Sequence, residues 1–205
     1  LPSSTDRLTV EAALLQYDGA SGAVSVLTST VLDNSNLTLD PDIDSYFTMD
    51  AAGGRLPGLI DATAQIRELA VAVSLGLALD RDQMRREAAA EALGDYMDGA
   101  MQDGLKKVVA LRPEHTRALD VAAPTAAMHR LHKLSEAMGE GENPGAEAVL
   151  REGDTAVDGF YRAQASMLPV LDQMLAQRID AVRQAKARMN DEMGLDIAKA
   201  IPTVI

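Results

Sequence analysis

The amino-acid sequence predicts an all-α protein, built as an elongated antiparallel bundle of about four to six long helices. Apolar residues recur at spacings of three and four along most of the 205 residues, which is the period of an amphipathic helix. The chain contains 2 Phe, 4 Tyr and no Trp, whereas strands favour aromatic and β-branched residues. Its hydrophobic content of 47% is sufficient for a buried core. We therefore expect a single domain over residues 1–205, with room for two stacked sub-bundles.

The first expected helix runs from about Asp6 to Leu32. Its apolar side chains are separated by three, four or sums of these, so they form one stripe along the helix. The stripe consists of Val10, Leu14, Tyr17, Val24, Leu27 and Val31. Because such a stripe is stabilised by burial against another apolar surface, this helix requires a packing partner.

A second helix is expected to begin near Pro41 and to continue to Leu77. Asp40 is suited to the N-cap position, because its carboxylate accepts hydrogen bonds from the free amides of the first turn. Pro41 is suited to the first helical position, because it has no amide to leave unsatisfied. Pro57 interrupts the apolar pattern, so we expect a kink or short break within Arg55–Gly58.

A third helix is expected from Asp80 or Arg81 to Leu111, because the residue before Pro113 is disfavoured in the α region. Its predicted inner stripe consists of Met84, Leu93, Met97, Leu105, Val108 and Leu111. A fourth helix is expected from Pro113 to Met138, ahead of the turn sequence GEGENPG. Its predicted stripe consists of Val121, Met128, Leu131, Leu134 and Met138.

The last expected helix is the longest and runs from about Ala146 to Met193 or beyond, with Pro169 expected to bend it. Its apolar residues keep close to a heptad rhythm, which is typical of helices that pack along a seam. They are Val157, Phe160, Leu168, Leu171, Leu175, Val182 and Met189. At a rise of 1.5 Å per residue, about 45 residues extend for about 70 Å, which favours an elongated molecule.

Charge and composition exclude several classes of function. The formal net charge is -12, whereas proteins that bind phosphate backbones concentrate Lys and Arg, so we expect no nucleic-acid partner. The chain has no cysteine, which excludes thiolate catalysis, disulfides and cysteine-based metal sites. No apolar run of about 18 residues is present, so we do not expect this chain itself to span a membrane.

No catalytic motif is recognisable, and we expect neither an enzyme nor a cofactor. The sequence lacks a Walker loop, GxSxG, GxGxxG and HExxH. His129 and His132 form an H-x-x-H pair, whose spacing can place two imidazoles on one helix face for a metal ion. Arg130 and Lys133 flank the pair with positive charge, which favours ordinary surface or interhelical histidines, and we expect no metal site.

Two arginines are the strongest candidates for ligand binding. Arg67 interrupts the apolar run AQIRELAVAV, and Arg55 lies at the expected kink. A guanidinium held between helices can bind a carboxylate ligand through two parallel hydrogen bonds, which predicts a small anionic ligand. The alternative is that each arginine pairs with an Asp or Glu of the chain. The other residues expected to line this end of the bundle are Asn36, Asp40, Ser45 and Tyr46.

The stretch DNSNLTLDPDIDSYFTMD, from Asp33 to Asp50, resembles a segment of the all-helical extracytoplasmic sensor domains of bacterial transmembrane receptors. These receptors include chemoreceptors of the methyl-accepting type, sensor histidine kinases and diguanylate cyclases. In those domains a phrase of the type S-x-L-x-L-D-P-D-x-x-S-Y precedes an L-P pair and a later arginine, which correspond here to Leu56, Pro57 and Arg67. Residues 156–179 are similar to the helix that leads back to the membrane.

The resemblance implies a periplasmic ligand-sensing domain of an inner-membrane receptor that takes part in signal transduction. It further implies a homodimer, transmembrane helices flanking the chain, and long helices that pass ligand or protein binding to a cytoplasmic output domain. A soluble helical scaffold or interaction protein is the alternative interpretation, and a metal-dependent helical-bundle enzyme ranks third.

Overall fold

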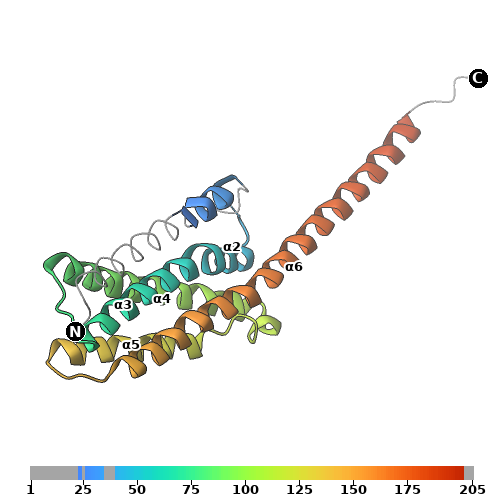
Figure 1. Cartoon of the computed structure of the whole chain (residues 1–205). Helices are drawn as coiled ribbons and strands as arrows, with labels where there is room; N and C mark the ends of the chain where they lie inside the picture. The colour runs from blue at the N-terminus through green and yellow to red at the C-terminus, as the bar shows by residue number, and fades with distance from the viewer. Residues whose placement is uncertain (1–22, 25, 35–39, 201–205) are drawn as a thin grey trace, which may run out of the picture.

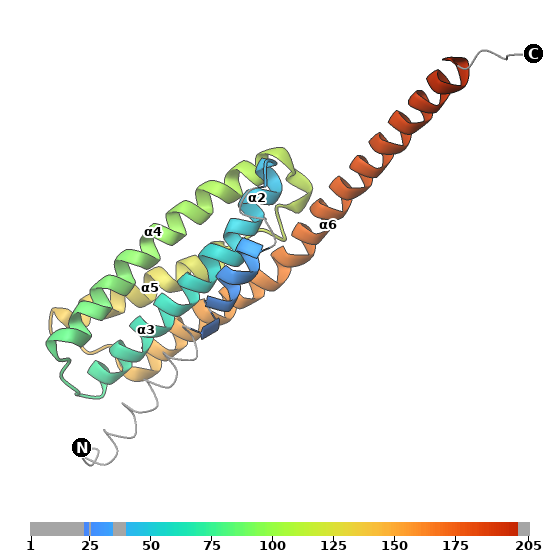
Figure 2. The same ribbon diagram turned by 90° about the horizontal axis from the view of Figure 1, so that it is seen from above.

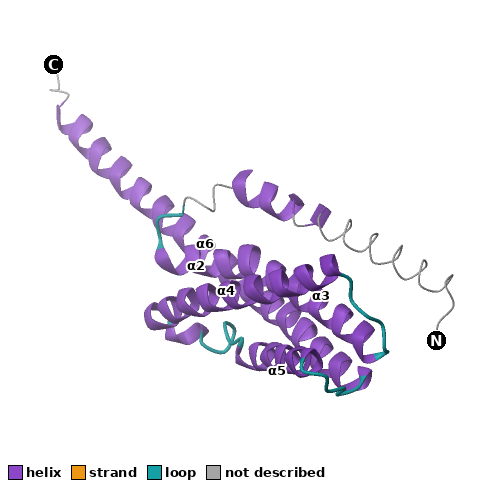
Figure 3. Cartoon of the chain, turned by 90° about the vertical axis from the view of Figure 1, so that its left-hand side faces the viewer, coloured by secondary structure: helices purple, strands orange, loops and turns teal. Residues whose placement is uncertain are grey.

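The computed structural model describes residues 23–24, 26–34 and 40–200, with side chains placed as far as residue 193. Throughout these ranges the chain consists of helices and connecting loops, without any strand (Figure 3). The helices pack side by side into an elongated bundle (Figure 1). The predicted all-α bundle of long helices is therefore confirmed.

Five labelled helices and two short irregular ones make up the part of the chain from residue 40 onward. In chain order they are α2 (Ile43–Met49), the π-helix η2 (Asp50–Arg55), α3 (Leu56–Ser74), α4 (Arg81–Leu111), the 3-10 helix η3 (Pro113–His115), α5 (Ala122–Gly139) and α6 (Ala146–Ala200). Successive long helices reverse direction, since short connections join α3 to α4 and α5 to α6 (Figure 2).

The core lies where α3 contacts α4, α5 and α6, and where α5 packs on α6. The larger cluster of buried apolar side chains includes Leu56, Leu59, Met128, Phe160 and Met167. A smaller cluster forms where α3 ends and α6 begins; it comprises Ala62, Ile66, Ala70, Ala90, Leu131 and Val149. Each fully buried Leu, Phe or Met contributes about 1.5–3 kcal/mol, so this seam supplies most of the stabilisation.

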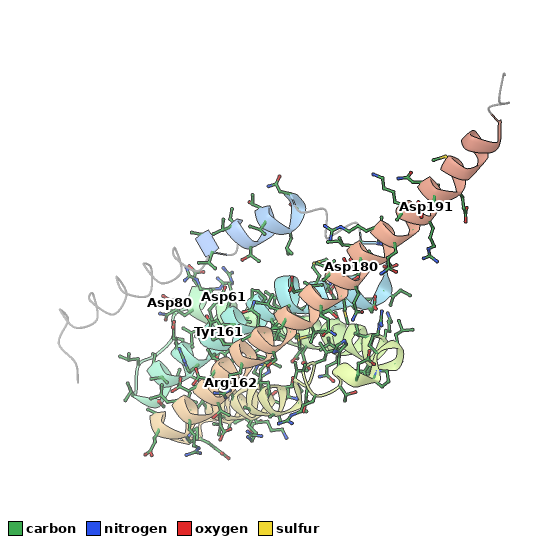
Figure 4. The ribbon with its side chains drawn as sticks, turned by 90° about the vertical axis from the view of Figure 1, so that its right-hand side faces the viewer. Asp61, Asp80, Tyr161, Arg162, Asp180 and Asp191 are labelled. Atoms are coloured by element: carbon green, nitrogen blue, oxygen red, sulfur yellow. The ribbon has the colours of Figure 1, made fainter. Side chains whose placement is uncertain are left out.

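The second half of α6 projects away from the bundle (Figures 1 and 2). Asp180 and Asp191 lie on this projecting part, whereas Arg162 lies where α6 runs beside the other helices (Figure 4). Beyond Met174, which is buried, α6 has no fully buried side chain as far as residue 193. Over a length of 55 residues α6 is about 80 Å long, and a large part of it has no neighbour among the described residues.

The start of the second helix and its irregularity differ from the prediction. The helix begins at Ile43 with Asp42 as the N-cap residue, and the Asp40 side chain instead accepts the Asp42 amide at 3.0 Å. No break occurs at Arg55–Gly58, because Pro57 occupies the first turn of α3, where a proline is tolerated. The irregularity is the π-helix η2, which precedes Pro57 and keeps the rod continuous.

The predicted bounds of the third helix are confirmed. Asp80 accepts the amides of Asp82 and Gln83, while the Gln83 side chain accepts the Asp80 amide, so a capping box starts α4. The predicted inner stripe is wrong at three positions, since the side chains of Met84, Leu93 and Leu111 are exposed. The buried face instead includes small residues, and these are Ala90, Gly94 and Gly104 together with Asp98, Met101, Leu105 and Val108.

Small residues on α4 face the core because they allow close approach. A Cβ added to Gly104 would lie 2.8 Å from the Phe47 ring, so a side chain at this position would separate α4 from α2. Hydropathy patterns underweight Gly and Ala, since these residues bury little apolar area of their own. The apolar area buried in the contact between α4 and α2 therefore comes mainly from the Phe47 side chain of α2 and not from Gly104 of α4.

The remaining helices agree with the prediction in part. The expected fourth helix is divided, because η3 is followed by a turn and α5 begins only at Ala122. Three of the five residues of the stripe predicted for this helix are buried, and they are Val121, Met128 and Leu131. The last helix extends to Ala200 and remains helical through Pro169, while Val182 is exposed. The first expected helix lies mostly outside the described residues, although residues 26–34 are helical.

Candidate functional site

The chain preceding α2 is attached to α6 through a group that we call the Arg178 cluster, comprising Asp40, Asp42, Ser45 and Arg178. The guanidinium contacts Asp40 Oδ1 through Nη1 at 2.6 Å and Asp42 Oδ2 through Nε at 2.6 Å. Its Nη2 donates to the Ser45 hydroxyl. All three partners lie within six consecutive residues at the start of α2, so a single arginine of α6 holds the N-terminus of α2 against α6.

The local sequence explains why these groups converge. Asp40 and Asp42 flank a proline, and the Asp40 carboxylate accepts the Asp42 amide, which folds the chain into a tight turn before the helix. This turn directs both carboxylates and the Ser45 hydroxyl toward α6. Arg178 lies four residues beyond Met174, which is the last buried residue of α6 as far as residue 193.

The charge of Asp40 is stabilised although the group is withdrawn from water. Its side chain is only 2% exposed, and burial by itself would raise its pKa. Hydrogen bonds from the Asp42 amide, the Ser45 hydroxyl and Arg178 outweigh burial, so the pKa of Asp40 lies below its usual value. Its second oxygen, Oδ2, is buried without a hydrogen-bond partner among the described residues, so the cluster leaves one acceptor unsatisfied.

A second ion pair joins the end of α4 to the same turn. Arg112 Nε donates to Asp44 Oδ2 at 2.8 Å, and this contact holds the pKa of Asp44 below its usual value against the opposing effect of burial. A cleft of about 340 Å³ lies between the two pairs, lined by Asp42, Asp44, Arg112, Met174, Gln177, Arg178 and Ala181. Both arginines already hold carboxylates, so an incoming anion would have to displace them. The arrangement is therefore suited to clamping α2, α4 and α6 together.

Two further predicted site residues, Arg55 and Tyr46, have other partners, although Tyr46 directly follows Ser45 in α2. Arg55 Nε donates to Asp50 Oδ2 at 3.0 Å, because the wider turn of the π-helix brings residues five apart onto one face. Its guanidinium also lies 5.6 Å from the centre of the Tyr96 ring on α4. Tyr46 packs edge-on against Phe47 with ring centres 5.1 Å apart.

Arg67 forms an ion pair with α6 rather than with the other predicted residues. Its Nη1 lies 2.5 Å from Asp154 Oδ1. Arg67 follows Ser45 by 22 residues in a continuous helical rod, which places them about 33 Å apart. The structure thus brings Asp40 and Ser45 together and leaves Arg55 and Arg67 apart from them. Asn36 lies outside the described residues.

Sequence reasoning did not identify Arg112 and Arg178 as site residues. Each pairs with a carboxylate far away in the chain, Arg112 by 68 residues and Arg178 by 138. No local pattern marks such a pair. The one available signal is the row of three aspartates around Pro41, whose mutual repulsion a cation from another helix would relieve.

Polar side chains bridge α4 and α5. Asp98 is buried and accepts from Thr125 Oγ1 at 2.9 Å and from Gln102 at 2.8 Å. His132 is also buried, with Nδ1 at 3.6 Å from Asp95 and with Nε2 lacking a hydrogen-bond partner among the described residues. Burial lowers the pKa of His132 and outweighs the attraction of Asp95. A neutral His132 in ordinary packing fits this environment.

The H-x-x-H pair has no further ligand arranged beside it in the described part of the chain. The ring centres of His129 and His132 are 6.3 Å apart, and no group of three or more His, Asp or Glu residues there is arranged to hold a metal ion. The α4–α5 contact also contains Glu91, whose pKa is raised by burial and by neighbouring carboxylates, Glu87 first among them.

Comparisons with protein-family models, with curated proteins and with solved structures find no match to this chain. Among the described residues, no helix is both long enough and apolar enough to cross a lipid bilayer. The functional interpretation therefore depends on the geometry of the bundle and on the residues of the turn before α2.

Proposed function

We propose that this chain is the extracytoplasmic ligand-sensing domain of a bacterial signal-transduction receptor. The observation that supports it most is the double role of one segment. Asp40 to Ser45 lie within the stretch that resembles such sensor domains, and they also hold α6 through Arg178 at the level where α6 leaves the bundle. A change in bundle packing at this level reaches the projecting half of α6 directly.

In this proposal α6 is the transmitting element. Along its packed half it is attached to the other helices by polar contacts at several depths, which include Asp154 with Arg67, Gln164 with the Ala52 carbonyl, and Arg178 with Asp40. A ligand that favours one packing of α6 over another shifts the equilibrium between two positions of the whole helix. The output domain on the far side of the membrane would respond to that shift.

The proposal places the domain in the periplasm as a homodimer, between transmembrane helices that lie outside these 205 residues. Exposed apolar side chains on the projecting half of α6 support the dimer. Ile179, Val182, Met189 and Met193 are 50% to 62% exposed. At about 100° per residue they fall within an arc of about 80°, which makes them one continuous stripe. A second α6 with the same stripe is a suitable partner.

A hybrid receptor tests the proposal. The chain is placed between the transmembrane helices of a histidine-kinase receptor, and kinase activity is measured with a library of small organic acids. We expect at least one compound to change kinase activity, and Arg178→Gln to abolish the change while the purified variant still binds the compound. Arg183→Gln is the matched control, since Arg183 forms an exposed ion pair with Asp180.

A hybrid that inserts into the membrane and binds a compound, yet keeps constant kinase activity, would refute the sensor proposal. A second candidate function, a helical interaction protein, is favoured by the same stripe on α6. The two candidates differ in what binds the apolar stripe of α6. Self-association of the chain through this stripe supports the receptor. A chain that stays monomeric at high concentration supports the interaction protein, because the stripe is then available to a different protein.

A further inference from the structure

A small open cavity lies between the middle of α6 and the segment that leads into α5. Its volume is about 220 Å³. Its lining residues are Arg117, Ala118, Asp120, Ala123, Pro124, Thr155, Gly159, Arg162, Ala163 and Ser166. Gly159 brings the two walls close together, because a Cβ there would lie 2.7 Å from Pro124 Cβ. Pockets for drug-sized ligands measure roughly 300–1,000 Å³, so this cavity suits a more compact molecule.

The two arginines of this cavity are unlike most others in the protein. The guanidinium groups of Arg117 and Arg162 form no hydrogen bond or ion pair with any residue that the structure describes. Elsewhere in the described chain only Arg81 shares this state, whereas arginines such as Arg67 and Arg178 hold carboxylates. In a chain of net charge -12, carboxylates are abundant, so two free guanidiniums on one cavity are a notable exception.

The other polar side chains of the cavity are already hydrogen-bonded within the protein, so the two arginines are the side chains that can donate to a ligand. The hydroxyls of Thr155 and Ser166 donate to backbone carbonyls of α6, those of Arg151 and Arg162 respectively, at 2.6 and 3.0 Å. The Asp120 carboxylate accepts the Ala122 amide at 2.9 Å. Asp120 weakens the attraction for an anion without cancelling it, because the cavity lining carries two positive charges and one negative charge.

We infer that this cavity binds a small dicarboxylate, with one carboxylate on Arg117 and the other on Arg162. Guanidinium groups bind carboxylates through strong, directional hydrogen bonds, and two of them on opposite walls select a molecule with two acids over one with a single acid. The biological use of this site rests on the proposed sensor function. A bound dicarboxylate would connect Arg162 of α6 to Arg117 of the segment before α5. In the structure, no ion pair connects Arg162 to that segment.

Isothermal titration calorimetry of the full chain with succinate, malonate and acetate in low-salt buffer tests the inference. We expect saturable binding of a dicarboxylate and much weaker binding of acetate. Arg117→Gln and Arg162→Gln should each lower the affinity about 10-fold to 100-fold, the effect of losing one charge-assisted contact. Asp120→Asn, which keeps the oxygen that accepts the Ala122 amide, should raise the affinity.

The matched control is Arg81→Gln, which removes an equally unpaired arginine at the far end of α4 and should leave the affinity unchanged. Absence of saturable binding, equal binding of acetate, or an equal loss with Arg81→Gln would overturn the inference. These outcomes are separate from those of the hybrid receptor. Binding without a kinase response would refute the sensor function and keep the site, whereas a kinase response without saturable binding of a dicarboxylate would refute the site and keep the sensor function.

Discussion

At the scale of single residues, stability depends on charges that are held away from water by a few partners. Arg178 satisfies Asp40, Asp42 and Ser45 at once, so its removal leaves a buried carboxylate without a cation. Hydrogen bonds to charged groups contribute about 1.5–3 kcal/mol, whereas exposed ion pairs contribute about 0–1 kcal/mol. The position of an ion pair therefore matters more than the number of pairs.

Arg178→Gln should lower the free energy of unfolding by about 2–4 kcal/mol, since two ion pairs and a hydrogen bond to one turn are lost. Urea denaturation followed by circular dichroism measures the change. Arg183→Gln, which removes an exposed pair with Asp180, should change stability by less than about 0.5 kcal/mol. Equal effects of the two variants would contradict the structural role of the Arg178 cluster.

We expect the same cluster to contribute to the stability of the protein in acid. The pKa of Asp40 is lower in the folded chain than in the unfolded chain, so the folded state binds fewer protons between these two values. Its stabilisation is complete above the ordinary pKa of an aspartate, about 3.9, and is lost as the pH falls through the lowered pKa. Asp40→Asn should flatten the decline of the unfolding free energy below pH 4, measured in urea at several pH values.

His132 should act in the same direction at a higher pH. Its pKa is lowered by burial, so the unfolded chain binds more protons below about pH 6.5 and stability falls as the pH decreases from there. His132→Gln should reduce the loss of stability between pH 7.5 and about pH 5.5, measured by urea midpoints. His129→Gln provides the control, because His129 is exposed; an identical pH profile for both variants would count against a buried neutral His132.

At the scale of elements, the π-helix η2 connects the sequence motif to α6. The Leu56 amide bonds to the Ala51 carbonyl five residues earlier, which is the π pattern and widens the helix by one residue. The widened turn leaves the Ala52 carbonyl free for the Gln164 side chain of α6, which donates to it at 2.8 Å. A glutamine of α6 thus satisfies a backbone group that an α-helix would satisfy internally.

Gln164→Leu should destabilise the chain by about 1–3 kcal/mol, because it leaves the part-buried Ala52 carbonyl without a partner. Gln173→Leu, at an exposed position of the same helix, should have little effect. Thermal unfolding of both variants measures the difference. If Gln164→Leu were neutral, water would be satisfying the carbonyl and the contact would not attach α6 to η2.

At the scale of the whole molecule, we expect the projecting half of α6 to determine the oligomeric state. Ile179, Val182, Met189 and Met193 leave an apolar stripe in water in a single chain, and a helix of this kind is stabilised by a matching partner. Val182→Glu and Met189→Glu together should weaken self-association at least tenfold, measured by analytical ultracentrifugation. Gln184→Glu, on the opposite face of the same turns, is the control, and no difference between them would contradict pairing through the stripe.

The fold could be predicted from the sequence because local signals determine it. Asp80 and Gln83 define the start of α4, and Pro113 accounts for its end at Leu111. The Arg178 cluster could not be predicted, because Asp40 and Arg178 are brought together only by the tertiary packing of α2 on α6. The predicted stripe of α4 is correct at Leu105 and Val108 but omits Gly104 for a related reason, because Gly104 is buried by the shape of Phe47 and not by its own hydropathy.

The attachment of α6 at Arg178 also determines how a movement of this helix would propagate. From Glu152, which pairs with Arg130, to Arg178 the helix is held over 26 residues or about 39 Å, and from Arg178 to Ala200 it extends freely for about 33 Å. A rod that is held along its packed half and free beyond Arg178 moves as one piece. A displacement of the packed half by about 1 Å along the helix axis would therefore appear at the far end with the same size and direction.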